Sequence, residues 1–481
     1  MVRADSTPSS KPAPDSAAGK VAFLQSCARC HGLTGAGDGR DAVRLFPRPR
    51  NLTEGVFKFR SPASGTPPTD DDLFTTVTHG LNAGGMPDWS QLDDATRWQL
   101  VAYVKSLSPA FTDAKPEPVN LGHDPGARHA DPKQGRAVYD KLGCAACHGP
   151  NGRANGTSAP TLVDNWGRAT RPANLTQGWS YRGGSDPASI VTRLVSGIDG
   201  SPMPSYAEAA TTEELWQLAY YVRSLQQDPR WAVIARVPFV AGALPDSVDD
   251  PRWDQPARVD VQLRVAPNPS GEIDAPLTTA AVSVQALHDR DRISVKLSWF
   301  DATDDHAEAA DAVAVAFRPV AVLGDVVTLQ TWPLPARAEG TEAGGPSSPA
   351  LDLCVWSATD QQVKEAAAGS YEPLLGRMLP QAATRPSHAV YEDGRWTLVM
   401  TRPLPVRTGR EASSRFIPVA FAVWDGAIQP HRAVSSWLDL DLQDPVVQES
   451  SMKPSASTML ITIASAVVLI IGFGRIIRRK P

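Results

Sequence analysis

The sequence of 481 residues has no excess of basic residues. It contains 47 lysines and arginines against 52 acidic residues, which gives a formal net charge of −5. Proteins that bind nucleic acid concentrate positive charge on one face or along one helix, so this balance excludes a nucleic-acid partner. The length predicts roughly three domains at about 150 residues each.

Cysteine is scarce, with five residues in the whole chain. Four of them lie in two C-x-x-C-H strings at 27–31 and 144–148, which leaves Cys354 alone. If both strings hold a cofactor, no internal disulfide framework is possible. The cysteines therefore indicate cofactor chemistry.

The N-terminal leader, residues 1–17, lacks the apolar run of a secretory signal. A long stretch without charge occurs near the other end, at 455–474, and matches the roughly 20 residues that a membrane-spanning helix needs. Basic residues dominate the tail that follows, 475–481. The positive-inside rule then predicts a single-pass helix in a bacterial cytoplasmic membrane, with the tail in the cytoplasm and the rest of the chain on the periplasmic side.

Two stretches of the chain repeat the same order of motifs. "RPRNLTEG" from Arg48 matches "RPANLTQG" from Arg171, "GGMPDW" matches "SPMPSY", and "WQLVAYVKSLS" matches "WQLAYYVRSLQ". In each copy a helical segment enters the C-x-x-C-H string, a Gly/Pro-rich loop follows, and an amphipathic helix closes the unit. Thr211 and Glu214 have capping-box spacing at the start of the second closing helix. We therefore expect two all-α domains, at 18–110 and 133–228, joined by a linker at 111–132.

A C-x-x-C-H string attaches c-type haem, because its two thiols reach the two vinyl groups of the porphyrin and its histidine lies beneath the iron. A redox or zinc-binding cysteine pair is the alternative for one isolated string, but two strings in matching repeats favour haem. The prediction is two covalently bound haem c groups, attached at Cys27, Cys30, Cys144 and Cys147, with His31 and His148 as proximal iron ligands.

The first unit offers two candidates for the sixth iron ligand, His79 and Met86. The repeat favours the methionine, because Ser196 stands at the position of His79 whereas Met203 stands at the position of Met86. Each methionine also follows the histidine of its own motif by 55 positions (86 − 31 and 203 − 148). His79 is expected to end a helix instead.

Ligation by histidine and methionine fills both axial positions of the iron and leaves none for a substrate. That arrangement favours electron transfer over catalysis. The two units resemble class I cytochromes c across residues 18–228. The resemblance implies that Pro87 and Pro204 shape the methionine loops, and that Trp98 and Trp216 are core residues of the closing helices.

From about Trp231 apolar and polar residues alternate, which is typical of half-buried strands. Val282 and Val284 precede a charged turn and Ile293 follows it, so a hairpin is expected there. Similar segments predict an all-β sandwich at 229–446 and a short tether at 447–454. The acidic segment "DATDDHAEAAD", 301–311, is interpreted as a charged connection between strands, with cation binding as the alternative.

The β region resembles the haem-binding γ subunit of ethylbenzene dehydrogenase and related dimethyl sulfoxide reductase family enzymes. In that family a Met and a Lys hold a b-type haem, but this chain reads "RPVAVLGDVV" and "HRAVSSW" where they are expected. Arg432 cannot substitute, because a guanidinium has no lone pair for iron. A domain of this fold without its haem is favoured, as a docking or spacing module. A b-type haem is possible but disfavoured, and its candidate ligands are His431, Met378 and Lys296.

The expected fold class is a multidomain chain of two all-α cytochrome c domains, one all-β sandwich and one C-terminal transmembrane helix. The expected function is electron transfer between a respiratory membrane complex and a soluble periplasmic redox protein. A cytochrome b/Rieske complex, a haem-copper oxidase and a molybdopterin enzyme are the candidate complexes. The alternative is a haem enzyme subunit, either a dihaem peroxidase or a small-substrate dehydrogenase. Partner subunits are expected, because a single helix without polar residues holds neither quinone nor haem.

Overall fold

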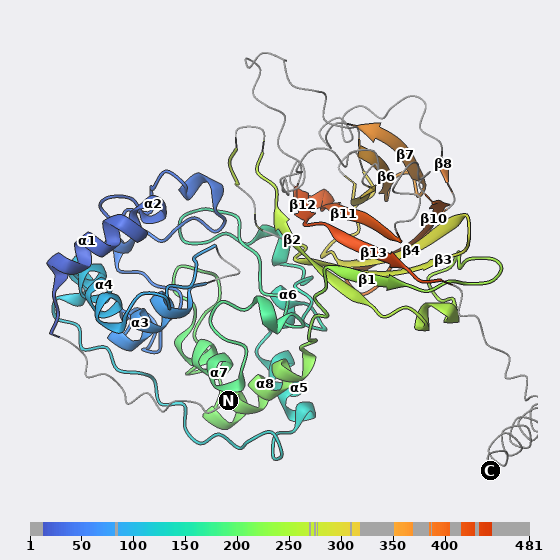
Figure 1. The fold of residues 1–481 in the computed structure, drawn as a ribbon. Coiled ribbons are helices and arrows are strands. Elements are labelled where there is room, and N and C mark those ends of the chain that lie inside the picture. The colour runs from blue at the N-terminus through green and yellow to red at the C-terminus, as the bar shows by residue number, and fades with distance from the viewer. Residues whose placement is uncertain are drawn as a thin grey trace, which may run out of the picture. The chain divides into compact units, whose positions relative to one another are not determined.

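A computed structural model describes the chain over most of its length. The described residues are 13–81, 85–268, 271–273, 276, 278–307, 310–317, 351–368, 384–385, 387–404, 415–428 and 432–444. The helices and strands that they form all belong to one compact unit, Met1–Gln443. Figure 1 shows helices along the first half of this unit and strands along the second.

The first unit of the repeat is helical, as expected. Asp15 caps its entry helix with its carboxylate, and Asp93 caps its closing helix in the same way. The two helices pack against each other, with Phe23 buried against Tyr103 at 5.1 Å between ring centroids. The helices are α1 (Ser16–Ser26), α2 (Ala28–His31), η1 (Ala42–Arg44), η2 (Leu52–Glu54), α3 (Asp70–His79), α4 (Asp94–Ser106) and η4 (Pro109–Phe111).

The second unit repeats the arrangement. The predicted capping box is present, because Thr211 and Glu214 bond reciprocally at the start of the closing helix. A further helix, α3 or α7, precedes each methionine loop; of these two, only the end of α3 at His79 was expected from the sequence. The helices are α5 (Pro132–Lys141), α6 (Ala145–His148), η5 (Ala159–Thr161), η6 (Gly178–Ser180), α7 (Pro187–Ser196) and α8 (Thr212–Leu225).

The described strands form one 13-stranded sheet. Its order is β8-β7-β6-β5-β11-β12-β2-β3-β4-β10-β9, and β13 pairs both β11 and β1. All these pairs are antiparallel except β1 with β13. The elements are β1 (Ile234–Val237), η7 (Pro251–Asp254), β2 (Val259–Val265), β3 (Ala281–His288), β4 (Arg292–Phe300), β5 (Ala312–Phe317), β6 (Leu351–Ser357), β7 (Val363–Ala368), β8 (Thr384–Arg385), β9 (Ser387–Tyr391), β10 (Arg395–Pro403), β11 (Phe416–Trp424), η10 (Gly426–Ile428), β12 (Arg432–Ser435) and β13 (Leu438–Leu442).

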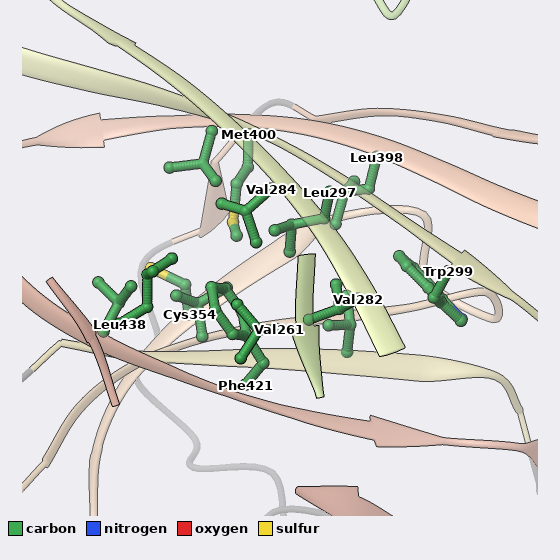
Figure 2. Close-up of a cluster of buried hydrophobic side chains, with 14 of the residues drawn as sticks. Val261, Val282, Val284, Leu297, Trp299, Cys354, Leu398, Met400, Phe421 and Leu438 are labelled. Atoms are coloured by element: carbon green, nitrogen blue, oxygen red, sulfur yellow. The ribbon is translucent and has the colours of Figure 1, made fainter. Parts of the chain in front are cut away.

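Alternate residues of the strands fill the main hydrophobic core, part of which is drawn in Figure 2. Two smaller clusters of buried residues lie beside it, one of them formed by β5, β6 and β11. The hairpin predicted around 282–299 is present as β3 and β4, and Val282 lies opposite Trp299 in its register. Both residues are fully buried. The period of two in the sequence therefore identified the buried face of these strands correctly.

The predicted fold class is wrong for the β region, which is one continuous sheet and not a sandwich of two separate sheets. The join is made where β12 pairs β2, with Val434 opposite Arg264. Alternation in the sequence shows that one face of a strand is buried, but it does not show which strands pair.

The membrane-spanning helix in the predicted fold class also needs correction. Of the helices in the described ranges, none has the length and apolar character needed to cross a membrane. The longest of them, α8, has 14 residues, whereas a span takes about 20. The predicted span, 455–474, lies outside the described residues.

Candidate functional site

Each C-x-x-C-H string forms a single helical turn, α2 or α6, directly after a longer helix. No disulfide joins the two cysteines of either string in the described residues. Both thiols of each turn are therefore available for the two thioether bonds of a haem c.

The two motif histidines are held by backbone carbonyl groups. Nδ1 of His31 lies 3.0 Å from the carbonyl oxygen of Arg50, and Nδ1 of His148 lies 2.9 Å from that of Ala173. A carbonyl oxygen only accepts, so Nδ1 carries the proton in each ring and Nε2 keeps its lone pair. Burial lowers the pKa of both histidines, which favours the neutral ring. Both rings therefore present the nitrogen that an iron ligand requires.

The carbonyl groups that hold the histidines belong to the repeated strings "RPRNLT" and "RPANLT". In each string the arginine side chain also bonds a backbone carbonyl, Arg48 to Ala42 and Arg171 to Ala159, both at 2.7 Å. Sequence reasoning used these strings only to align the repeat and assigned them no role. Their recurrence at equivalent positions was the available signal.

The loop after each motif returns to the histidine by equivalent hydrogen bonds. The amide of Gly37 donates to the carbonyl of His31, and the amide of Ala154 donates to that of His148, both at 2.8 Å. Gly39 lies so close to the first motif that a Cβ there would meet the carbonyl oxygen of Arg29 at 2.4 Å. The loop after each motif therefore packs closely against its C-x-x-C-H turn.

Met86 and Met203 lie in matching turns. The amide of Leu81 donates to the carbonyl of Met86 at 2.8 Å, and the amide of Ile198 donates to that of Met203 at 3.1 Å. Both methionines are partly buried. The turns are therefore built alike, as the equal spacing in the sequence suggested.

Other residues singled out in the sequence lie around these turns. His79 is the last residue of α3 and is exposed, as expected of a helix-end residue. Pro87 and Pro204 are exposed beside the two methionines. Trp216 is buried in the core of its unit and donates to the carbonyl of Leu121, and Trp98 stacks on Phe74.

An arginine buried between the two repeat units was missed in the sequence. The side chain of Arg60 is fully buried, and its guanidinium donates to the carbonyl of Ser196 at 3.0 Å. It also pairs with Asp199 at 2.6 Å. Ser196 ends α7 and directly precedes the turn that carries Met203. The first unit therefore supports the methionine turn of the second.

In the β region, Lys296 is the one suggested b-type haem ligand that lies in a described range. It is on β4, and its Nζ donates to the carbonyl of Val248 at 2.7 Å. Burial lowers the pKa of Lys296. His431 and Met378 lie outside the described residues. The amine of Lys296 is therefore engaged with the backbone.

Comparisons with known proteins give matches to parts of the chain. The sequence profile of the family "Cytochrome C oxidase, cbb3-type, subunit III" matches residues 14–104 and 130–222. The cbb3-type cytochrome c oxidase subunit CcoP of Azospirillum brasilense is 28% identical over 222 residues, which are 44% of this chain and 61% of that protein. The γ subunit of dimethylsulfide dehydrogenase from Rhodovulum sulfidophilum is 31% identical over 155 residues, 30% of this chain and 52% of that protein.

A solved structure of the Kuenenia stuttgartiensis reducing HAO-like protein complex contains a further match. That chain is 37% identical, with a TM-score of 0.42, and 45% of this chain covers its full length. The present chain spans about three fifths or less of the two curated relatives described above, at 61% and 52% of their lengths. Residues 14–104 and 130–222 are cytochrome c domains of the cbb3 type that bind two covalent haem c groups, in a chain homologous to dihaem cytochrome subunits.

Proposed function

We propose that the chain is an electron-carrying subunit that works between a respiratory membrane complex and a soluble redox protein, on the periplasmic side of a bacterial cytoplasmic membrane. The names of its relatives support a respiratory complex, since they include subunits of a cbb3-type oxidase and of dimethylsulfide dehydrogenase. The complex is accordingly a haem-copper oxidase, a cytochrome b/Rieske complex or a molybdopterin enzyme.

The main support for this proposal is that Met86 and Met203 lie in turns with the same backbone hydrogen bond. Each haem site offers a partly buried histidine with a free Nε2, and a methionine in a turn closed by an equivalent backbone hydrogen bond. A haem c with these two axial ligands supplies a one-electron redox centre without an open coordination position. The residues proposed to hold the two groups are Cys27, Cys30, His31 and Met86, and Cys144, Cys147, His148 and Met203.

The protein's own contribution is to keep these ligands fixed. The carbonyls of Arg50 and Ala173 orient the histidines, and the backbone bonds of the two turns orient the methionines. Arg60 keeps the two units in contact at the second turn. A peroxidase or a small-substrate dehydrogenase needs an iron position that a substrate can reach, and the two matching turns argue against that alternative.

Replacing the methionines tests the ligand assignment. Met86→Ala and Met203→Ala should each remove about half of the red-region charge-transfer band of methionine-ligated ferric haem. Each should also lower the potential of one haem by on the order of 0.1 V, within the roughly 0.8 V range that axial ligands span. Met400→Leu, a nearly volume-conserving change in the β core, is the matched control and should change neither. A full band in either alanine variant would refute methionine ligation of that haem.

The haem content tests the β region. Pyridine haemochrome analysis should give two haem c and no haem b per chain, both in the wild type and in Lys296→Gln. The reason is that Nζ of Lys296 is already hydrogen-bonded to the carbonyl of Val248. One haem b per chain in the wild type would overturn the proposal of a β domain without haem, and its loss in Lys296→Gln would identify Lys296 as a ligand.

A further inference from the structure

Three aspartates meet at one end of the sheet. Asp301 directly follows β4, Asp311 directly precedes β5, and Asp425 directly follows β11. Strands β5 and β11 pair with Ala312 opposite Trp424, so Asp311 and Asp425 are neighbours across the ladder. Each of the three side chains offers a carboxylate oxygen, and these oxygens all lie within 4.8 Å of one another.

The cluster is buried. Asp301, Asp311 and Asp425 are 2%, 0% and 6% exposed. No hydrogen-bond partner in the described part of the chain reaches Oδ2 of Asp301, and that atom is shielded from solvent. A buried oxygen without a partner is costly. This atom is an available ligand position within the cluster.

The hydrogen bonds around Asp311 show that its carboxylate is an acceptor. Oδ2 accepts from Nε1 of Trp396 at 2.9 Å and from the amide of Asp305 at 3.0 Å. Oδ1 accepts from the amide of Gly426 at 2.8 Å. Both oxygens of Asp311 therefore receive N–H donors, and hydrogen bonds of this kind favour the negatively charged form of a carboxyl group.

That negative charge has little compensation from the protein. Within the described ranges no lysine or arginine forms an ion pair with Asp301, Asp311 or Asp425. Asp305 adds a further nearby acid, and Arg171 contributes an opposing field at Asp425. Buried carboxylates are normally paired or bound to a metal.

We propose that Asp301, Asp311 and Asp425 bind one divalent cation of the calcium type. Calcium prefers oxygen ligands at about 2.3–2.6 Å, so two of its ligands lie at most about 4.6–5.2 Å apart. The carboxylate oxygens of the cluster, all within 4.8 Å of one another, are close enough to be shared by one such ion. A set of three carboxylates favours calcium, because magnesium usually keeps several waters and binds through one or two carboxylates.

The cation would fix both ends of the connection between β4 and β5 to the end of β11. The same end of the sheet contacts the second cytochrome unit. The amide of Asp301 donates to the carbonyl of Gly394, and the adjacent Asp393 accepts from Asn151 and pairs with Arg153, both in the loop after the second C-x-x-C-H motif. The bound ion would therefore support the place where the sheet meets the second haem domain.

Calcium binding to the full-length holoprotein tests this proposal. After treatment with EDTA and dialysis, the protein should bind one Ca²⁺ per chain, measured by calorimetry and by metal analysis. Saturating Ca²⁺ should raise the Tm by about 4 °C or more, because the ion binds the folded state only. Mg²⁺ should bind more weakly.

Asp311→Asn and Asp425→Asn should abolish the stoichiometric binding and the Ca²⁺-dependent rise in Tm. Asp304→Asn is the matched control, because Asp304 is an exposed acid in the same segment, and it should leave both unchanged. Wild-type protein that binds no Ca²⁺ would overturn the proposal, even if both cluster variants failed to fold. Binding that survives Asp311→Asn, or that is lost in Asp304→Asn, would overturn it as well. The haem spectra report the proposed electron-transfer function separately, and they do not depend on this result.

Discussion

Gly19→Ala is expected to destabilise the first cytochrome unit, and Gly135→Ala is expected to destabilise the second. Both glycines lie where an entry helix crosses a closing helix. A Cβ at Gly19 would come within 1.9 Å of the carbonyl oxygen of Gln99, and one at Gly135 within 2.2 Å of that of Gln217. The helices would have to separate, at a cost of about 3 kcal/mol, the upper end for overpacking. At a solvent-exposed position inside a helix, the same substitution stabilises the protein by about 1 kcal/mol. A loss of stability in these variants would therefore indicate the close helix crossing.

Thermal unfolding and the haem spectra measure this effect. Gly19→Ala should lower the Tm and weaken the charge-transfer band of the first haem, because α1 leads directly into Cys27. The thioether bonds should keep both haems attached. Gly135→Ala should weaken the band of the second haem instead. Lys20→Ala, at an exposed position of the same helix, should keep both bands and the wild-type Tm. A full band and an unchanged Tm in Gly19→Ala would contradict the close crossing of α1 and α4.

The features that could be predicted from the sequence are those set by local pattern. The capping box at Thr211 and the buried face of the hairpin at Val282 were predicted correctly. The repeat also predicted equivalent positions for Met86 and Met203, and each lies in a turn with the same backbone hydrogen bond; their ligation of iron stays a prediction. Each depends on residues close together in the chain or on the comparison of two copies, so each leaves a signal in the sequence.

The features that could not be predicted depend on contacts between distant residues. Val434 pairs with Arg264, and this pairing joins the strands into one sheet. The alternation of apolar and polar residues in either strand does not indicate it. The carbonyl of Arg50 holds His31 through a backbone atom, which any residue supplies. The acidic segment 301–311 was interpreted as a charged connection, because its third carboxylate, Asp425, lies more than a hundred residues away in the chain.

Arg60→Ala is expected to loosen the contact between the two cytochrome units and to disturb the second haem. The buried guanidinium of Arg60 pairs with Asp199 and donates to the carbonyl of Ser196. Truncation to alanine removes this cation from Asp199 and this donor from the carbonyl of Ser196. Breaking a buried ion pair from one side costs about 3–5 kcal/mol. Because Ser196 precedes the turn of Met203, the charge-transfer band of the second haem should weaken while that of the first is kept. Electron exchange between the haems after flash reduction should slow.

Two further substitutions separate this effect from a general loss of charge. Arg29→Ala breaks the pair with Asp41, in which the arginine is 62% exposed, and it should cost less than about 1 kcal/mol and leave both haem bands unchanged. Arg60→Lys keeps the charge but loses the planar guanidinium group, so its stability and its second charge-transfer band should lie between those of Arg60→Ala and the wild type. Asp199→Asn combined with Arg60→Ala should be less destabilising than the sum of the two single changes, because both remove the same pair. If Arg60→Ala behaved like Arg29→Ala, the two units would not depend on this arginine, and the methionine turn of the second unit would be held by that unit alone.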